Sequence, residues 1–127
     1  MAIGSILGAC TRGDLATKGD VTERFRTFES DPGEKALRAL LNVRTDGEVS
    51  YLHMALIGKA FAQQPDLFRA AATNLGTEME RRSFRWLAES GDAVFEYYPD
   101  HEPQSFDQVF QDSAWLKSHQ SLQTKGS

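Results

Sequence analysis

Cysteine is nearly absent from this chain, because Cys10 is the single one among its 127 residues. No internal disulfide is therefore possible, and a reducing, cytoplasmic compartment is expected. The chain also lacks any apolar run near the roughly 20 residues that a helix needs to cross a bilayer, so we expect no membrane partner. Residues 7–10, Leu-Gly-Ala-Cys, resemble the end of a bacterial lipoprotein signal. That alternative stays open, although the basic stretch that begins such signals is missing.

A surplus of basic side chains is also lacking. The chain has 14 lysines and arginines against 18 aspartates and glutamates, for a net charge of −4. This balance argues against general attraction to polyanions, because charge attraction drives non-specific binding to nucleic acids. Any binding to RNA or DNA must therefore come from a local basic face.

The side-chain clusters that carry catalysis or hold metals are not evident either. His53, His101 and His119 are scattered along the chain, so no metal site is predicted. No glycine-rich phosphate loop joins a strand to a helix. One catalytic alternative stays open, namely a nucleophilic pair of Cys10 and a histidine that are distant in the sequence but close in the folded chain. The acidic run from Asp92 to Glu102 is typical of a solvated loop, and we predict no catalytic residue, no enzyme activity and no cofactor.

Helix-start and helix-stop signals fill most of the sequence. We interpret residues 1–20 as a flexible lead-in, 21–118 as one domain and 119–127 as a flexible tail. Helices are expected at 21–29 behind Asp20, from Pro32 to the turn at 45–47, between Ser50 and Pro65, briefly within 65–76, at 78–89 and after Ser105. Gly76 is the expected left-handed C-cap of the short helix, and residues 48–50 form either a very short strand or a bridge.

Residues 93–98, Ala-Val-Phe-Glu-Tyr-Tyr, are the best strand candidate because they are rich in β-branched and aromatic side chains. On a strand, Tyr97 and Tyr98 point to opposite sides, so one of them faces outward, and Tyr98 is the candidate for stacking on a base. The expected fold is mainly α: a small helical bundle of winged-helix type, with a short β-strand or hairpin after the fourth helix.

The helix expected at 78–89 begins with a capping box, in which Thr77 and Glu80 have the required spacing. At about 100° per residue, one broad side carries apolar and small residues. These are Met79, Ser83, Phe84, Trp86 and Leu87. Trp86 and Leu87 are expected to anchor this side in the core, and Glu80 lies near its boundary.

The opposite side of this helix carries Arg81, Arg82 and Arg85 together with Glu78. Arginine suits phosphate oxygens and base edges, because its planar guanidinium donates two parallel hydrogen bonds. This pattern indicates a nucleic-acid-binding face. The alternative is an ordinary solvated face, since Glu78 and Arg82 also form a stabilising i, i+4 pair.

Several short motifs between residues 36 and 98 resemble the LOTUS domain, also called OST-HTH. They are Leu37-x-x-Leu40-Leu41, Gly47-Glu48-Val49, Pro65-Asp66-Leu67-Phe68, Leu75-Gly76, Trp86-Leu87 and Val94-Phe95-Glu96. The resemblance implies a non-catalytic winged helix. Some members of that family bind RNA, including guanine-rich RNA, and others dock on a DEAD-box helicase. It also implies that Arg81, Arg82 and Arg85 face RNA, with Lys59 and Arg69 as outer phosphate contacts.

The sequence therefore predicts a non-catalytic binding domain that binds RNA or DNA through an arginine-bearing helix. Single-stranded or structured RNA is the preferred partner. The alternative is a protein–protein interaction module, such as a regulator, an adaptor or an inhibitor or immunity-type protein, that uses an acidic or aromatic surface and binds no nucleic acid. The net charge supports this alternative, whereas the grouping of arginines supports the first function.

Overall fold

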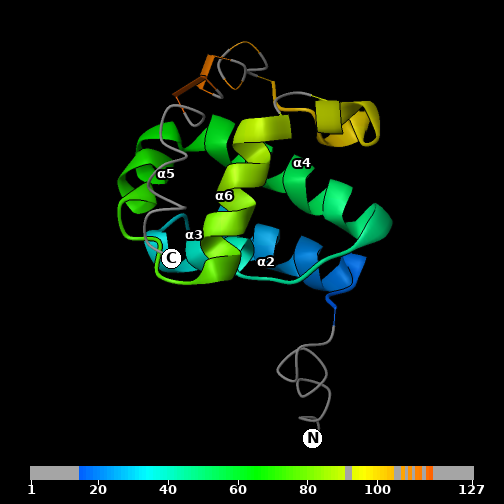
Figure 1. Ribbon diagram of the computed structural model, residues 1–127, viewed down its shortest axis with the longest axis horizontal. Helices are drawn as coiled ribbons and strands as arrows, with labels where there is room; N and C mark the ends of the chain where they lie inside the picture. The colour runs from blue at the N-terminus through cyan, green and yellow to red at the C-terminus, as the bar shows by residue number, and fades with distance from the viewer. Residues whose placement is uncertain are drawn as a thin grey trace, which may run out of the picture.

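The computed structural model describes residues 15–90, 93–104, 107, 109, 111–112 and 114–115, and most of them are helical (Figure 1). The elements are α2 (Lys18–Ser30), α3 (Glu34–Leu41), α4 (Gly47–Gln63), α5 (Pro65–Ala72), α6 (Glu78–Ser90) and the short 3-10 helices η1 (Ala93–Glu96) and η2 (Pro99–His101). The predicted mainly helical class is confirmed. Among the described residues, no helix combines the length and the apolar character that a membrane span requires.

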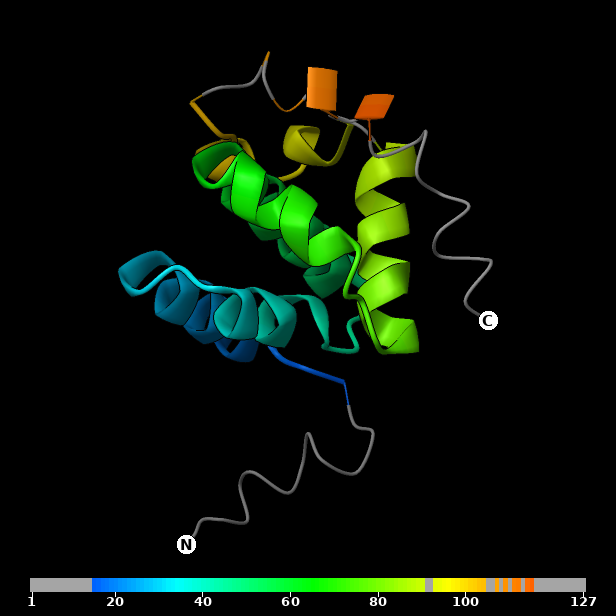
Figure 2. The ribbon, with the colours of Figure 1, turned by 90° about the vertical axis from the view of Figure 1, so that its left-hand side faces the viewer.

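The helices form two layers with α6 across them. Helices α2 and α3 lie side by side in one layer, and α4 and α5 lie above them, while α6 stands against the edges of both layers (Figure 2). Helix α4 is central, because it contacts α2, α3, α5, α6 and both 3-10 helices. Its buried residues therefore include more than one apolar stripe, as expected for a helix covered on several sides. The apolar residues predicted for this helix, Leu52, Leu56, Ile57, Ala60 and Phe61, are all buried.

Stacked phenylalanines connect the α4–α5 layer to α6. Phe61 of α4 stacks on Phe68 of α5 with ring centroids 4.6 Å apart, and Phe68 stacks on Phe84 of α6 at 5.9 Å. All three side chains are almost completely buried. Aromatic pairs of this kind add to the stabilisation that their buried area provides. The stack therefore holds α6 against the α4–α5 layer and helps to determine which side of α6 faces outward.

The folded part of the chain begins earlier than the predicted boundary at residue 20. Helix α2 starts at Lys18 because Thr17, and not Asp20, is its N-cap. The Thr17 hydroxyl accepts the Asp20 N–H at 3.1 Å, and the Asp20 carboxylate accepts the Thr17 N–H at 2.9 Å. Ala16 is buried and donates its N–H to the Arg44 carbonyl at 2.8 Å. The predicted tail at 119–127 and the lipoprotein-like motif at 7–10 lie outside the described residues.

Helix α4 also starts earlier than expected, and residues 48–50 are helical, so neither the strand nor the bridge predicted there is present. The Asp46 carboxylate accepts the Gly47 N–H at 2.8 Å and caps the helix. Gly47 has a φ of 56°, a left-handed conformation that glycine adopts at little cost. Ser50 is not the cap; its hydroxyl donates to the Gly47 carbonyl at 2.7 Å.

Gly76 is not the left-handed C-cap that was predicted, because Gly47 is the one glycine with positive φ among the described residues. The structure gives another reason for glycine at this position. A Cβ atom there would lie 2.9 Å from Nη2 of Arg38. The missing side chain therefore lets the Arg38 guanidinium approach the start of α6.

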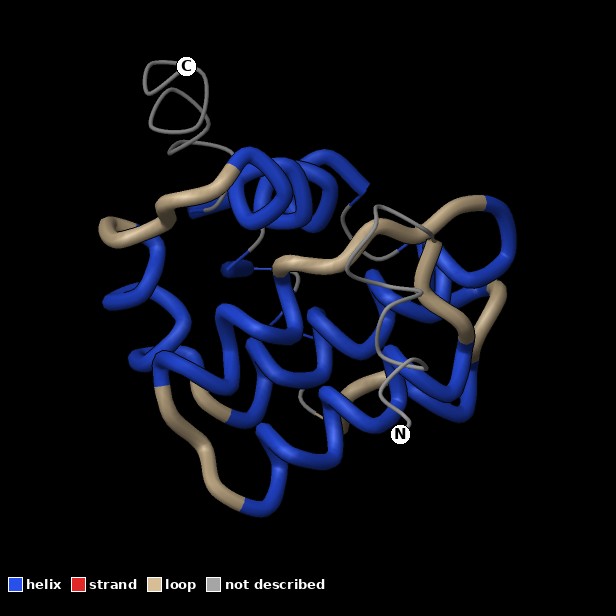
Figure 3. Tube along the Cα trace, turned by 90° about the horizontal axis from the view of Figure 1, so that it is seen from below, coloured by secondary structure: helices blue, strands red, loops and turns tan. Residues whose placement is uncertain are grey.

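The strand predicted at 93–98 is wrong. Residues 93–96 form the 3-10 helix η1, and no strand is present in the part of the chain that the structure describes (Figure 3). A strand needs a neighbour for its backbone hydrogen bonds, whereas this segment packs on helix α4. Both Val94 and Phe95 are buried there, and a turning backbone places these two adjacent side chains on one side. The described residues of the last predicted helix, from 107 to 115, are helical, while its proposed cap, Ser105, lies outside them.

Candidate interaction surface

The inner side of α6 is tied to α3 by a buried charge. Glu80 is 3% exposed, and its carboxylate accepts hydrogen bonds from Arg38 Nε at 2.9 Å and Nη2 at 3.3 Å. The backbone N–H groups of Gly76 and Thr77 donate to the same carboxylate at 2.8 and 2.9 Å. Burial by itself raises the pKa of Glu80, but the hydrogen bonds and the positive charge of Arg38 outweigh it, so the pKa is lowered.

The same contacts confirm the predicted capping box, because the Thr77 hydroxyl accepts the Glu80 N–H at 3.0 Å. One turn further along, the Ser83 hydroxyl donates to the Leu41 carbonyl at 2.8 Å. Phe84 and Leu87 complete the buried side. Hydrogen bonds and apolar packing thus fix the rotation of α6 about its axis, and the positions of its arginines follow from that rotation.

The three arginines of α6 do not form one open basic face. Arg81 has a side chain that is only 18% exposed, its Nη2 lies 3.9 Å from Glu78 Oε1, and its buried Nε has no hydrogen-bond partner. Arg85 Nε lies 3.8 Å from Glu89 Oε1. Arg82 is exposed, and its Nη1 lies 3.6 Å from the Met79 thioether. Two of the three guanidinium groups are therefore near a glutamate of the same helix.

The outer residues predicted to contact phosphate lie in other surroundings. Lys59 Nζ is 5.8 Å from the centre of the Phe25 ring. Arg69 forms ion pairs with Asp66 and Asp112, which link α5 to the C-terminal helical residues. The Tyr98 hydroxyl donates to the Glu48 carbonyl at 2.8 Å, and its ring is half-buried. These contacts give the three side chains roles within the fold.

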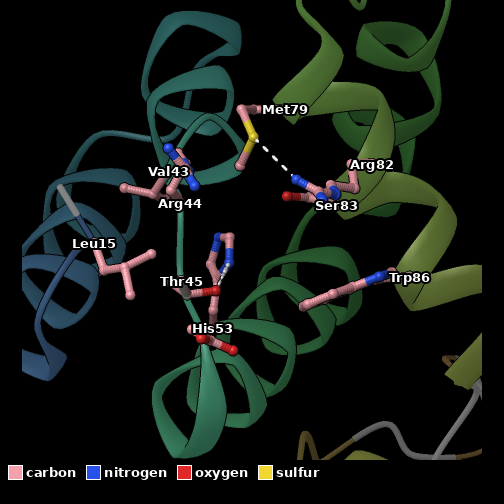
Figure 4. A pocket seen from close by; sticks show the side chains of 10 residues that line it. Leu15, Val43, Arg44, Thr45, His53, Met79, Arg82, Ser83 and Trp86 are labelled. Atoms are coloured by element: carbon pink, nitrogen blue, oxygen red, sulfur yellow. Dashed lines mark hydrogen bonds between the residues drawn. The ribbon is translucent and has the colours of Figure 1, made fainter. Parts of the chain in front are cut away.

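A pocket of about 330 Å³ lies between the 43–46 segment and α6, and we name it the arginine pocket. Figure 4 shows Leu15, Val43, Arg44 and Thr45 on one side, Met79, Arg82, Ser83 and Trp86 on the other, and His53 between them. Asp46 completes the lining. Among the described residues of its lining, two are arginines and one is an aspartate, and both arginines are exposed.

His53 is the buried residue between the walls of the arginine pocket. Its Nε2 lies 2.7 Å from the Leu40 carbonyl oxygen, which accepts the ring proton, and its Nδ1 lies 3.5 Å from the Thr45 hydroxyl. Burial lowers the pKa of His53 to about 4; the Leu40 hydrogen bond opposes this effect and the nearby charge of Arg24 adds to it. The imidazole is therefore neutral near pH 7 and supplies no positive charge to the pocket.

A second, larger pocket of about 510 Å³ adjoins the first, because Trp86 lines both. We name it the aromatic pocket; its other lining residues are Ser50, Tyr51, Met54, Glu89, Ser90, Ala93, Val94 and Tyr97. The rings of Tyr51 and Tyr97 stack across α4 and the end of η1, with centroids 4.3 Å apart. Tyr51, Trp86 and Tyr97, which we call the aromatic face, are 41%, 37% and 62% exposed.

The aromatic face was not predicted from the sequence. Trp86 was assigned to the core, but it stands at the rim of two pockets. Tyr98 was chosen as the outward tyrosine, yet Tyr97 is the exposed one. Strand alternation was the wrong rule for a segment that is not a strand. Tyr51 and Arg44 carried no signal in the sequence, because only the fold brings them beside α6.

The described residues contain no group of three or more histidine, cysteine or acidic side chains placed to hold a metal ion. Comparison with protein-family models, with curated proteins and with solved structures finds no match to this chain. The resemblance to LOTUS domains therefore stays a prediction. The residues that line the two pockets are the observations that bear on function.

Proposed function

We propose that this chain is a non-catalytic protein-interaction domain that docks a partner on its aromatic face. One observation carries the proposal. Among the described residues, the exposed large hydrophobic side chains are Leu15, Tyr51, Trp86 and Tyr97, and each of them lines one of the two adjoining pockets. Gathering all of these side chains on one face is the distribution expected of a binding surface.

The residue types support a protein partner. Tryptophan, tyrosine and arginine are enriched at protein interfaces and supply most of their binding energy. The rings of Tyr51 and Tyr97 are already stacked, so less conformational entropy is lost when a partner covers them. Among the described residues that line the aromatic pocket, Glu89 is the one that carries a charge. The occupant that fits this pocket is therefore a bulky apolar side chain, presented by a peptide segment of the partner.

A peptide selection tests the proposal without knowledge of the partner. Random peptides displayed on phage are selected against the full chain, and the enriched peptides are measured by fluorescence anisotropy. We expect Trp86→Ala to weaken binding by about 30-fold, because removing a central aromatic residue from an interface costs about 2 kcal/mol or more. Tyr97→Phe keeps the ring and is the matched control, with a change within about twofold.

Each variant is first compared with the parent chain by circular dichroism and thermal unfolding, so that loss of folding is separated from loss of binding. Peptides that bind Trp86→Ala as tightly as the parent would overturn the proposal. The same holds if repeated selections enrich no peptide at all.

Nucleic-acid binding is a second candidate, and one observation favours it. Arg82 and Arg44 both line the pocket beside the exposed ring of Trp86. Arginine next to an exposed aromatic ring suits a phosphate and a stacked base. The resemblance to LOTUS domains also belongs here, because these domains are winged helices and some of them bind guanine-rich RNA. The acidic neighbours of Arg81 and Arg85 weigh against it.

Salt dependence tests the second candidate. If the domain binds RNA, labelled guanine-rich and uridine-rich oligonucleotides are retained at low salt, and their affinity falls steeply as salt rises, because counterions are released on binding. Arg82→Glu then lowers the affinity further. Absence of binding to either oligonucleotide at low ionic strength would rule the candidate out.

A further inference from the structure

We infer that the docked segment carries a basic residue next to its bulky apolar one, and that this basic side chain pairs with Glu89 in the aromatic pocket. The inference rests on the proposed docking function and adds the charge of the ligand. The apolar side chain occupies the pocket, while the cation binds at the side of the pocket that the C-terminal end of α6 forms.

The charge of the pocket lining is the first support. Among the described residues of that lining, Glu89 alone carries a charge, and its side chain is 53% exposed. Glu89 and Ser90 are the last two residues of α6, and the C-terminal end of a helix carries partial negative charge from its last carbonyl groups. All of α6 is described, and its last turn contains no basic residue. A cation is therefore the complementary ligand here.

The fold gives little reason for a glutamate at position 89. A negative side chain in the last turn opposes the helix macrodipole, so it is unfavourable for α6 itself. The Arg85 Nε lies 3.8 Å from Glu89 Oε1, which is too long for a hydrogen bond. In this pair the basic residue precedes the acidic one, which is the less favourable order at i, i+4. The Glu89 carboxylate is therefore able to exchange this weak contact for a closer one with a ligand.

The exposed rings are the second support. Tyr51, Trp86 and Tyr97 line the same pocket as Glu89, and all three are partly exposed. The face of an aromatic ring carries negative charge density, so it attracts a cation that lies within about 6 Å of the ring centre. At about 510 Å³ the pocket has the volume of a ligand site. Because lysine and arginine bury their apolar stems readily, such a stem is able to lie on these rings while its charged end reaches Glu89.

The test uses the enriched peptides from the selection described above. We expect them to share a basic residue close to a bulky apolar one. The tightest peptide is synthesised with its basic residue and with the neutral counterpart, which is citrulline for arginine or acetyl-lysine for lysine. Both peptides are titrated against the parent chain and against Glu89→Gln. The neutral peptide should bind the parent about fivefold more weakly, whereas Glu89→Gln should bind the two peptides equally, within about twofold.

A control variant and a stability measurement sharpen the result. Glu78→Gln removes the same charge from the same helix, but Glu78 is exposed and lines neither pocket, so the preference for the basic peptide should remain. Glu89→Gln should unfold at the same temperature as the parent or slightly higher, because it removes a charge that opposes the macrodipole. A clearly lower midpoint would overturn the inference, because the fold itself would then account for this glutamate.

The outcomes separate the inference from the proposed function. Three results would overturn the cation site and leave the docking surface standing: enriched peptides without a basic residue, equal binding of the charged and neutral peptides to the parent, or a preference that survives in Glu89→Gln. Failure of repeated selections to enrich any peptide overturns both. Recovery of affinity when Glu89→Lys is paired with a peptide carrying glutamate in place of its basic residue would support the inference.

Discussion

The inner and outer sides of α6 differ in which side chains are buried and which are exposed. On the inner side, Glu80 is buried, and its carboxylate accepts four hydrogen bonds, two from Arg38 and two from backbone N–H groups. On the outer side, Trp86 is exposed and stands near the stacked pair of Tyr51 and Tyr97. A charge is therefore buried on one side, and large apolar rings are exposed on the other.

This contrast separates a structural feature from a functional one. The buried carboxylate has its partners within the protein, and its role is complete when the chain folds. The exposed part of each ring gains little from folding, because the water that it contacts is removed only when another molecule covers it. Changes on the inner side should therefore alter stability, and changes on the outer side should alter binding with little effect on stability.

Glu80→Ala should produce the largest loss of stability, about 3 kcal/mol by urea denaturation, because it removes a buried ion-pair partner together with the carboxylate of the capping box. Glu78→Ala is the matched control, since this residue of the same helix is exposed and its substitution should change the unfolding free energy by less than about 0.5 kcal/mol. Equal effects of the two substitutions would contradict the assigned role of the inner side.

The second prediction concerns pH. His53 has a pKa of about 4 in the folded chain, against an ordinary value of 6.5. As the pH falls below 6.5, the unfolded chain binds this proton first, so the stabilisation present at higher pH is lost as the pH approaches 4. The loss should be about 2–3 kcal/mol between about pH 7 and 4.5, measured by denaturation at several pH values.

His53→Gln should flatten this pH dependence, because the amide keeps a donor for the Leu40 carbonyl and does not titrate. His101 provides the comparison. Its pKa is lowered mainly by burial, further by the charge of Lys59, and raised in part by Asp100. It is only half-buried, so His101→Gln should leave most of the slope in place. A slope that persists in His53→Gln would show that another group carries it.

The third prediction concerns the contact that positions η1 beside the aromatic pocket. A Cβ atom on Gly58 would lie 2.7 Å from Cζ of Phe95. Gly58→Ala should therefore lower the unfolding free energy by about 1–2 kcal/mol, since the clash outweighs the roughly 1 kcal/mol gained from better helix propensity. Gly19→Ala, where the nearest atom is 3.7 Å away, is the control and should not destabilise the chain. An unchanged midpoint in Gly58→Ala would mean that Phe95 moves aside freely.

The smallest effect on stability is expected at Tyr97, although its effect on peptide binding should be large. Tyr97→Ala removes the stack with Tyr51, which contributes at most about 1 kcal/mol to folding at an exposed site. Thermal unfolding should barely change, while anisotropy with the selected peptides shows a clear loss. A loss of stability near that of Glu80→Ala would show that the ring serves the fold.

Much of the helical fold was predictable because helix signals are local. The capping box of Thr77 and Glu80 placed the start of α6 correctly, since its hydrogen bonds join residues three apart. The apolar residues of α4 were also predicted, and they are buried. The start of α4 was missed because Asp46 and Ser50 are both suitable N-cap residues, and the structure uses Asp46. The 93–98 segment was missed because its residues favour a strand locally, whereas packing on α4 favours the 3-10 helix.

The sequence by itself determined a mainly helical chain and the presence of arginines and aromatic residues along 78–98. The tertiary structure decided which of these side chains faces outward. Glu80 is buried because Arg38, 42 residues earlier, reaches it, and Trp86 stands at the surface because the phenylalanine stack and Ser83 fix the rotation of α6. The physical reason is that helix formation depends on neighbours within one or two turns, whereas burial depends on contacts between residues that are distant in the chain.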